Sequence, residues 1–179
     1  CSIGTGGTLS GVAKGLRDLC PEIKIGLADP FGSAMHSYFL NGVLKSTGSS
    51  ISEGIGQGRI TRNLEGLEVD CSFEVSDSEA LETLFELLYN EGLCVGISAA
   101  INVNGAIKMA RKLGKGKTIV TILCDHGMRY QSKIFNKEYL IENNLPLPFW
   151  MKSEFSRIKC DKREPYQENI LWSCRGFNV

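Results

Sequence analysis

The sequence predicts an α/β fold built on an open, twisted, mainly parallel sheet with flanking helices. Two observations support this prediction. Strand-like runs alternate with runs of helical periodicity along the chain, and the chain opens on a glycine-rich turn that connects a strand end to a helix. Cys1-Ser2-Ile3 resembles the last residues of a strand whose beginning is missing, so we expect a fragment whose sheet is incomplete at the N-terminus.

The glycine-rich turn, Gly4-Thr5-Gly6-Gly7-Thr8, is suited to holding a phosphate group. Glycines let an anion approach the backbone, and the first N–H groups of the following helix are unpaired donors. The turn is not a Walker loop, because Val12 and Ala13 replace the required Lys and Ser/Thr. It is not a full dinucleotide fingerprint either, because Leu9 replaces the third glycine. A turn without a ligand fits the motif alone equally well.

The next elements complete a strand-helix-strand unit. Leucines and small apolar residues recur at helical spacing over residues 9–19, and Pro21 ends that helix. Residues 23–28 form a short apolar strand, which makes a right-handed crossover unit of a parallel sheet. Residues 31–62 are predicted to be irregular. Within them, the glycines of residues 53–58 suit either a backbone close to a ligand or ordinary turns.

The remaining pattern predicts further strands and helices in alternation. They are a strand at 71–75, a helix at 80–90 opened by a capping box at 76–79, a strand at 92–97, a helix from Ser98 to 110, a central strand at 118–123, and a helix at 134–140. Ligands bind at the carboxyl ends of parallel strands. The glycine turn, Ser98 and Cys124-Asp125 are therefore expected to face one crevice.

The composition narrows the function classes. The net charge is zero and the pI is near 6.9, which argues against nucleic acid and anionic membranes as partners. No apolar run is long enough to span a bilayer. Seven cysteines without a C-x-x-C pair argue against a zinc site and a disulfide framework, and favour a reducing, cytoplasmic compartment. Cys20, Cys71 and Cys94 are predicted to be small buried hydrophobes.

Four motifs in order carry a resemblance to a known family. They are Gly4-Thr5-Gly6-Gly7-Thr8-Leu9-Ser10-Gly11, Glu53-Gly54-Ile55-Gly56, Glu91-Gly92-Leu93-Cys94-Val95-Gly96-Ile97-Ser98-Ala99-Ala100 and Gly127-Met128-Arg129-Tyr130-Gln131-Ser132. With these motifs the chain resembles the carboxyl-terminal half of the cysteine synthase (O-acetylserine sulfhydrylase) family. These are pyridoxal 5'-phosphate enzymes of the tryptophan synthase β-like fold, fold type II. The resemblance covers residues 1–150, and residues 151–179 are predicted to be an appended tail.

The resemblance implies a cofactor site. Gly4, Thr5, Gly6, Gly7 and Thr8 would bind the phosphate of pyridoxal 5'-phosphate, and Ser98 would lie beside the pyridine nitrogen. A neutral hydroxyl at that nitrogen suits β-elimination and replacement better than transamination. From the residues alone, Ser98 is also a candidate helix N-cap. The best-known members have Pro-Ser where this chain has Cys124-Asp125, so neither residue is assigned a catalytic role.

The resemblance also implies an activity for a longer parent protein. That parent would make cysteine from O-acetylserine and sulfide by elimination followed by addition, and it would be a homodimer. The family's Schiff-base lysine lies in its amino-terminal half, and no lysine here matches it, so no catalytic residue is assigned and the chain alone is expected to be inactive. Alternatives are a cystathionine β-synthase, a serine/threonine dehydratase of the same fold, and a truncated fragment that binds cofactor weakly or acts as an interaction module.

Overall fold

The computed structural model describes residues 1–152. Of the predicted tail, Met151 and Lys152 belong to the short helix α7 (Phe149–Lys152), and the rest lies outside the described residues. None of the helices within residues 1–152 combines the length and apolar character that crossing a membrane requires.

A parallel pair of strands forms the centre of the fold. β1 (Gly26–Pro30) pairs with β2 (Cys71–Val75), and Gly26 lies opposite Cys71. Cys1 runs along the other edge of β1, where its nitrogen donates to the Gly26 oxygen at 2.9 Å and its oxygen accepts from the Ala28 nitrogen at 3.2 Å. The predicted helix is present as α1 (Gly7–Leu19) and leads to β1, whereas residues 1–3 form no strand and contact β1 through these Cys1 hydrogen bonds. The strand at 71–75 is confirmed.

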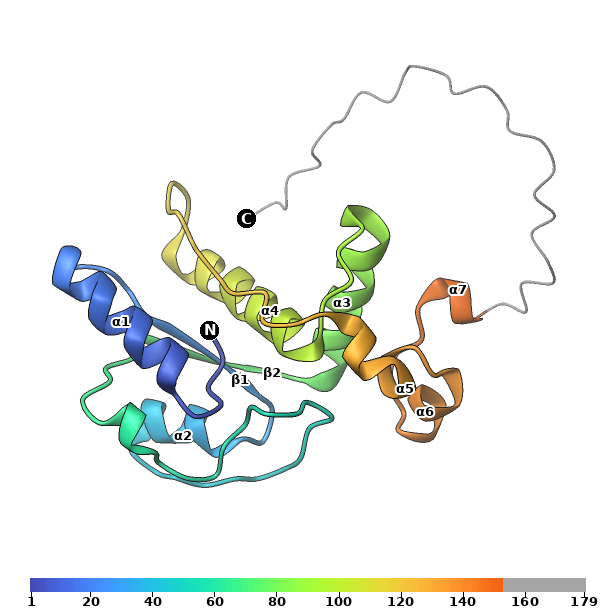
Figure 1. Ribbon diagram of the computed structural model, residues 1–179, viewed down its shortest axis with the longest axis horizontal. Helices are drawn as coiled ribbons and strands as arrows, with labels where there is room; N and C mark the ends of the chain where they lie inside the picture. Colours follow the sequence, from blue (N-terminus) through green and yellow to red (C-terminus); the bar gives the residue numbers. More distant parts are fainter. Residues whose placement is uncertain (153–179) are drawn as a thin grey trace, which may run out of the picture.

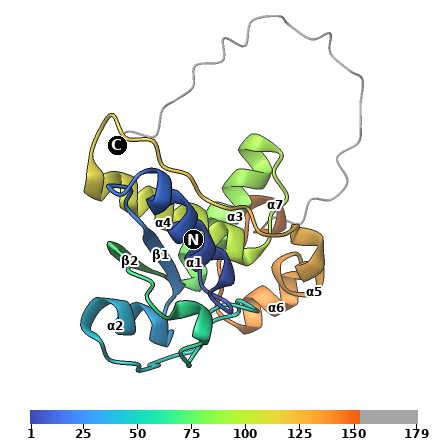
Figure 2. The ribbon, with the colours of Figure 1, turned by 60° about the vertical axis from the view of Figure 1, so that its left-hand side comes forward.

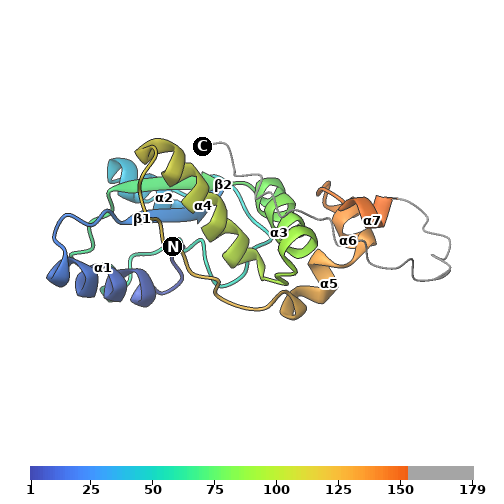
Figure 3. The same ribbon diagram turned by 90° about the horizontal axis from the view of Figure 1, so that it is seen from above.

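Helices cover both faces of this sheet. In Figure 1, α4 (Ile97–Leu113) lies above the strands and α2 (Ala34–Asn41) below them, and Figure 3 shows α4 crossing the sheet. Successive residues of β1 point to opposite faces. Leu27 packs with α1 and α2, whereas Ala28 packs with α4 and α3 (Asp77–Glu91). The predicted capping box of α3 is present: the Ser76 hydroxyl accepts from the Glu79 nitrogen, and the Glu79 carboxylate accepts from the Ser76 nitrogen.

Helix α2 was not expected from the sequence, which predicted an irregular stretch there. Its first turn is held by acceptors that precede it: the Ser33 hydroxyl accepts from the Met35 nitrogen at 3.4 Å, and the Asp29 carboxylate accepts from the His36 nitrogen at 2.8 Å. Asp29 belongs to β1, so a tertiary contact fixes this helix. Beyond it, residues 42–61 are irregular as predicted, and a 3₁₀ turn, η1 (Arg62–Leu64), follows. β1 itself begins three residues after the predicted start.

Two predicted strands are wrong. Residues 92–97 form no strand, and within them only Val95 pairs, in an isolated antiparallel bridge with His126. Residues 118–123 lack a strand partner in the described part of the chain, and Val120 is 85% exposed. The buried side chain of Asn102 in α4 makes the hydrogen bonds that a neighbouring strand would otherwise make to these segments. Its Oδ1 accepts from the Ser2 nitrogen at 2.6 Å, and its Nδ2 donates to the Ile122 oxygen at 2.8 Å. The amino-terminal segment thus lies close to α4 (Figure 2).

The carboxyl-terminal part of the described chain is a series of short helices instead of the single helix predicted at 134–140. They are the 3₁₀ turn η2 (Gly127–Tyr130), α5 (Gln131–Ile134) and α6 (Lys137–Glu142). The helix breaks because the Asn136 side chain accepts from the Tyr139 nitrogen at 3.1 Å and so starts α6 anew. The burial prediction holds for Cys71, but Cys94 is half-buried, and Cys20 is exposed because it follows the last turn of α1.

Candidate functional site

A cavity of about 590 Å³ brings together segments that are far apart in the sequence. The predicted glycine turn and Ser98 both line it, as do Cys124 and Asp125. The expectation that these residues face one crevice is therefore met. The complete lining is Cys1, Ser2, Gly4, Thr5, Gly6, Gly7, Thr8, Leu9, Glu53, Gly54, Ile55, Ser98, Ile122, Cys124, Asp125, Arg129 and Tyr130.

The glycine turn presents unpaired backbone donors to this cavity. Gly6 is the N-cap of α1, with a left-handed φ of 87°, and no side chain caps the helix. The first intrahelical bond runs from the Ser10 nitrogen to the Gly6 oxygen at 3.0 Å, so the N–H groups of residues 7–9 have no partner inside the helix. Together with the positive end of the helix dipole, these N–H groups make the turn a place for an anion.

A strap formed by Glu53, Gly54 and Ile55 lies directly on the turn. A Cβ added at Gly4 would come within 2.5 Å of the Gly54 carbonyl oxygen, so only glycine fits there. The strap is fastened on its other side by an ion pair between Glu53 and Lys133 of α5. The bond from Lys133 lowers the pKa of the Glu53 carboxyl, and the same contact raises the pKa of Lys133. The strap therefore closes one wall of the cavity.

Ser98 lies in the first turn of α4 and is 7% exposed. It is not the N-cap that the sequence allowed, because α4 begins one residue earlier and Gly96 takes the cap position. Gly96 must be small, since an added Cβ would collide with the Asp125 carboxylate and lie 2.7 Å from the Tyr130 ring. The start of α4 and residues 125–130 are thus packed closely against each other beside Ser98.

Asp125 and Tyr130, to which the sequence assigned no role, form a hydrogen-bonded pair in the lining of the cavity. The Tyr130 hydroxyl donates to Asp125 Oδ2 at 2.6 Å. Burial, followed by this bond, raises the pKa of Tyr130 to about 12, so the phenol stays neutral. Asp125 Oδ1 is buried without a partner within residues 1–152, and the Arg129 guanidinium lies 3.8 Å from Oδ2. Tyr130 belongs to the Gly127–Ser132 motif, but the sequence did not reveal its contact with Asp125.

The remaining polar residues considered in the sequence are Cys124, His126 and His36, and each makes a different contact. Cys124 is exposed, and its sulfur accepts from Asn102 Nδ2 at 3.3 Å. His126 lies outside the cavity lining, where its ring Nδ1 accepts from the Met128 nitrogen at 3.2 Å. His36 contacts the Ser72 hydroxyl at 2.7 Å. No group of His, Cys, Asp or Glu side chains within residues 1–152 is arranged to hold a metal ion.

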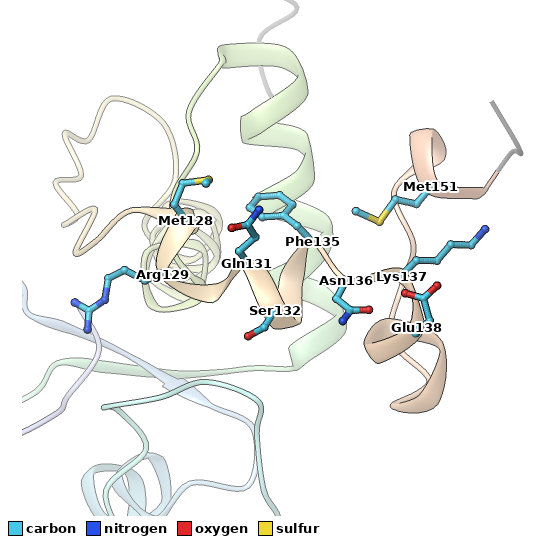
Figure 4. Close-up of a pocket in the computed structure, with 9 residues that line it drawn as sticks. All are labelled: Met128, Arg129, Gln131, Ser132, Phe135, Asn136, Lys137, Glu138 and Met151. Atoms are coloured by element: carbon cyan, nitrogen blue, oxygen red, sulfur yellow. The ribbon is translucent and has the colours of Figure 1, made fainter. Parts of the chain in front are cut away.

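A second hollow, of about 720 Å³, is more open and is formed almost entirely by one segment of the chain (Figure 4). Apart from Met151, all its lining residues come from residues 128–138. It contains none of the predicted site residues. Arg129 lines both hollows, and Figure 4 shows it extending away from the other labelled side chains. The cavity at the glycine turn is therefore the candidate site.

Comparison with known proteins identifies the family of the chain. The family model "Pyridoxal-phosphate dependent enzyme" matches residues 1–125. The chain is 45% identical over 150 residues to cysteine synthase 1 of Neurospora crassa, covering 81% of this chain and 40% of the relative. It is 38% identical over 151 residues to the cysteine synthase of Dictyostelium discoideum, covering 79% and 40%.

A solved structure is also similar. The crystal structure of an O-acetylserine dependent cystathionine beta-synthase from Helicobacter pylori matches with a TM-score of 0.65 and 35% identity, covering 74% of this chain and 41% of that one. The chain therefore spans about 40% of the length of these three proteins.

Proposed function

The chain belongs to the pyridoxal-phosphate dependent enzymes, of fold type II, and from this premise we propose that it is the phosphate-binding part of a cysteine synthase. The whole enzyme would replace the acetate of O-acetylserine with sulfide and act as a homodimer. The observation that supports this best is the convergence of the glycine turn, Ser98 and the strap of residues 53–55 on one cavity. The names of its relatives point to the same reaction.

The residues of the cavity fit the cofactor. Three unpaired N–H groups at residues 7–9 suit a phosphate dianion. Gly4, Gly6 and Gly7 line the cavity and have no side chains that could fill the cradle. When bound, pyridoxal phosphate supplies an electron sink for elimination and replacement at the β-carbon of an amino acid.

In this proposal Ser98 binds the pyridine nitrogen. Its hydroxyl is neutral, so it can exchange a hydrogen bond with the nitrogen without holding a proton on it as a carboxylate would. Because Ser98 is buried in the first turn of α4, its position is fixed by the helix. The strap with Glu53, Gly54 and Ile55 would exclude water from that side of the cavity.

The test is a titration of the 179-residue chain with pyridoxal phosphate, followed by borohydride reduction and mass analysis. We expect saturable binding with a spectrum near that of the free aldehyde, competition by inorganic phosphate, and no single lysine modified. A matched pair of variants checks the place of binding. Gly7→Asp adds a negative charge at the first helical position, whereas Gly7→Asn adds the same volume without the charge.

A Cβ added at Gly7 meets nothing closer than Asn63 Nδ2 at 3.6 Å, so the first atom of either side chain causes no collision. We expect Gly7→Asp to abolish phosphate competition and Gly7→Asn to retain most of it, because only the charge repels the dianion. Equal binding by the two variants would contradict the proposed phosphate site. Specific reduction of one lysine would contradict the view that no lysine of this chain forms the Schiff base.

The Helicobacter pylori structure favours one alternative, a cystathionine β-synthase that uses the same O-acetylserine donor. The donor half of that reaction would use the same cofactor site, and only the thiol acceptor differs. Assay of the whole parent enzyme with sulfide and with a thiol amino acid distinguishes the two: faster turnover with the amino acid would favour this alternative.

A further inference from the structure

One carbonyl in the glycine turn is held by two side chains that are distant in the sequence. The Thr61 hydroxyl donates to the Thr5 oxygen at 2.6 Å, and Asn63 Nδ2 donates to the same oxygen at 3.1 Å. Thr5 lines the cavity, whereas Thr61 and Asn63 do not. The Thr5 carbonyl is therefore directed away from the cavity, toward the segment that contains η1.

This direction determines where the next N–H group points. The described chain has no cis peptide bond, and in a trans peptide the C=O and the following N–H point in opposite directions. With the Thr5 oxygen turned toward η1, the Gly6 N–H is turned toward the cavity side. A reversed peptide would place the negative end of the carbonyl dipole where the anion binds.

The orientation of this peptide needs to be fixed by contacts. Gly6 has a φ of 87°, and glycine populates positive and negative φ about equally, so the turn has little intrinsic preference. Leu64 is 5% exposed and packs under Gly6 so closely that an added Cβ would collide with its side chain. Leu64 directly follows Asn63 in η1, so the segment that contains Thr61 and Asn63 packs against the turn at Gly6.

From these contacts we propose that Thr61 and Asn63 are positioning residues for phosphate binding. Together they orient the Thr5–Gly6 peptide so that Gly6 adds its N–H to the donors of residues 7–9. Neither residue touches the ligand, and their effect acts through the Thr5 carbonyl. The inference rests on the proposed phosphate site and deepens it.

The experiment compares four single variants of the 179-residue chain. Thr61→Val and Asn63→Ala remove the two donors, and the controls Thr118→Val and Asn90→Ala make the same changes at exposed positions outside the cavity. Dissociation constants are measured for pyridoxal phosphate, for inorganic phosphate and for pyridoxal, which lacks the phosphate. The carbon-13 shift of the Thr5 carbonyl in the free protein reports its hydrogen bonds directly.

We expect each donor variant to bind both phosphate ligands about fivefold more weakly, since one hydrogen bond contributes about that factor. Binding of pyridoxal and both control variants should be unchanged, and the Thr5 shift should move in the donor variants alone. Wild-type affinity in Thr61→Val and Asn63→Ala would overturn this inference while leaving the proposed site intact. A wild-type chain that binds neither phosphate ligand would overturn the proposed site itself.

Discussion

Asp29 shows how a single buried carboxylate shapes the fold next to the site. It is fully buried at the carboxyl-terminal part of β1. One oxygen accepts from the His36 nitrogen and so fixes the start of α2, while Oδ1 has no partner within the described residues. Burial raises the pKa of this carboxyl above its ordinary value of 3.8, although bonds to Ser33 and His36 oppose the shift.

The raised pKa predicts a pH dependence of stability. In the native state Asp29 holds its proton to a higher pH than in the unfolded chain, so its contribution is fully present below pH 3.8 and is lost as the pH rises through the folded pKa. Asp29→Asn keeps an acceptor for the His36 nitrogen and removes the charge. As the pH rises from 3.8, we expect the unfolding free energy of Asp29→Asn, measured with urea, to fall less than that of the wild type.

A control for this comparison is Asp18→Asn, at an exposed position of α1. That variant should follow the wild-type pH profile. If Asp29→Asn and the wild type lose stability in parallel over this interval, then burial of Asp29 is not the cause of the pH dependence.

At the scale of elements, the α3 capping box offers a second prediction. Ser76→Ala removes the acceptor for the Glu79 nitrogen and one of the Glu79 contacts. We expect a loss of about 1 kcal/mol of unfolding free energy, the usual effect of losing an N-cap side chain. Ser78→Ala, at the exposed neighbouring position, is the control and should change the unfolding free energy by less than about 0.5 kcal/mol. Equal losses in both variants would show that the cap is not responsible.

The helices that the sequence predicted correctly have their start and stop residues within or next to the helix itself. Helix α1 follows a glycine turn and precedes a proline, and α3 has its capping box within four residues. Helix α2 lacks such a signal, because its first turn depends on Asp29 of β1. The strand prediction at 118–123 was wrong because apolar, β-branched residues indicate a capacity for pairing, whereas a strand also needs a partner.

Asn102 takes the place of that pairing, which gives a third prediction. Asn102→Leu would leave the Ser2 N–H and the Ile122 carbonyl without their bonds, at a cost of about 1–3 kcal/mol for each buried group. We expect faster amide exchange in residues 118–125 in addition to the loss of stability. In Asn90→Leu, an exposed position of α3, exchange in this segment should be unchanged. Unaltered exchange in Asn102→Leu would mean that other contacts hold the segment.

For the whole molecule, the place of the site was predictable and its internal contacts were not. The glycine turn, Ser98 and Cys124-Asp125 line one cavity as expected, although the strands predicted at 92–97 and 118–123 are absent and Asn102 holds residue 122 against the start of the chain instead. The Tyr130–Asp125 bond, the Glu53–Lys133 ion pair and the contacts of Thr61 with Thr5 depend on distances between segments. Local sequence patterns carry no information about such distances.

The extended segment at 118–123 leads to a last prediction, on association. Val120 is 85% exposed and Leu123 is 47% exposed, on a stretch whose backbone has no strand partner in the described part of the chain. Unpaired apolar strands pair readily with other chains. We expect the 179-residue chain to self-associate as its concentration rises, as measured by sedimentation velocity, and Val120→Lys to weaken this association. Leu19→Lys, at an equally exposed position in α1, is the control and should leave association unchanged. If Val120→Lys and Leu19→Lys weaken association equally, general surface charge is the cause and the unpaired segment is not the contact.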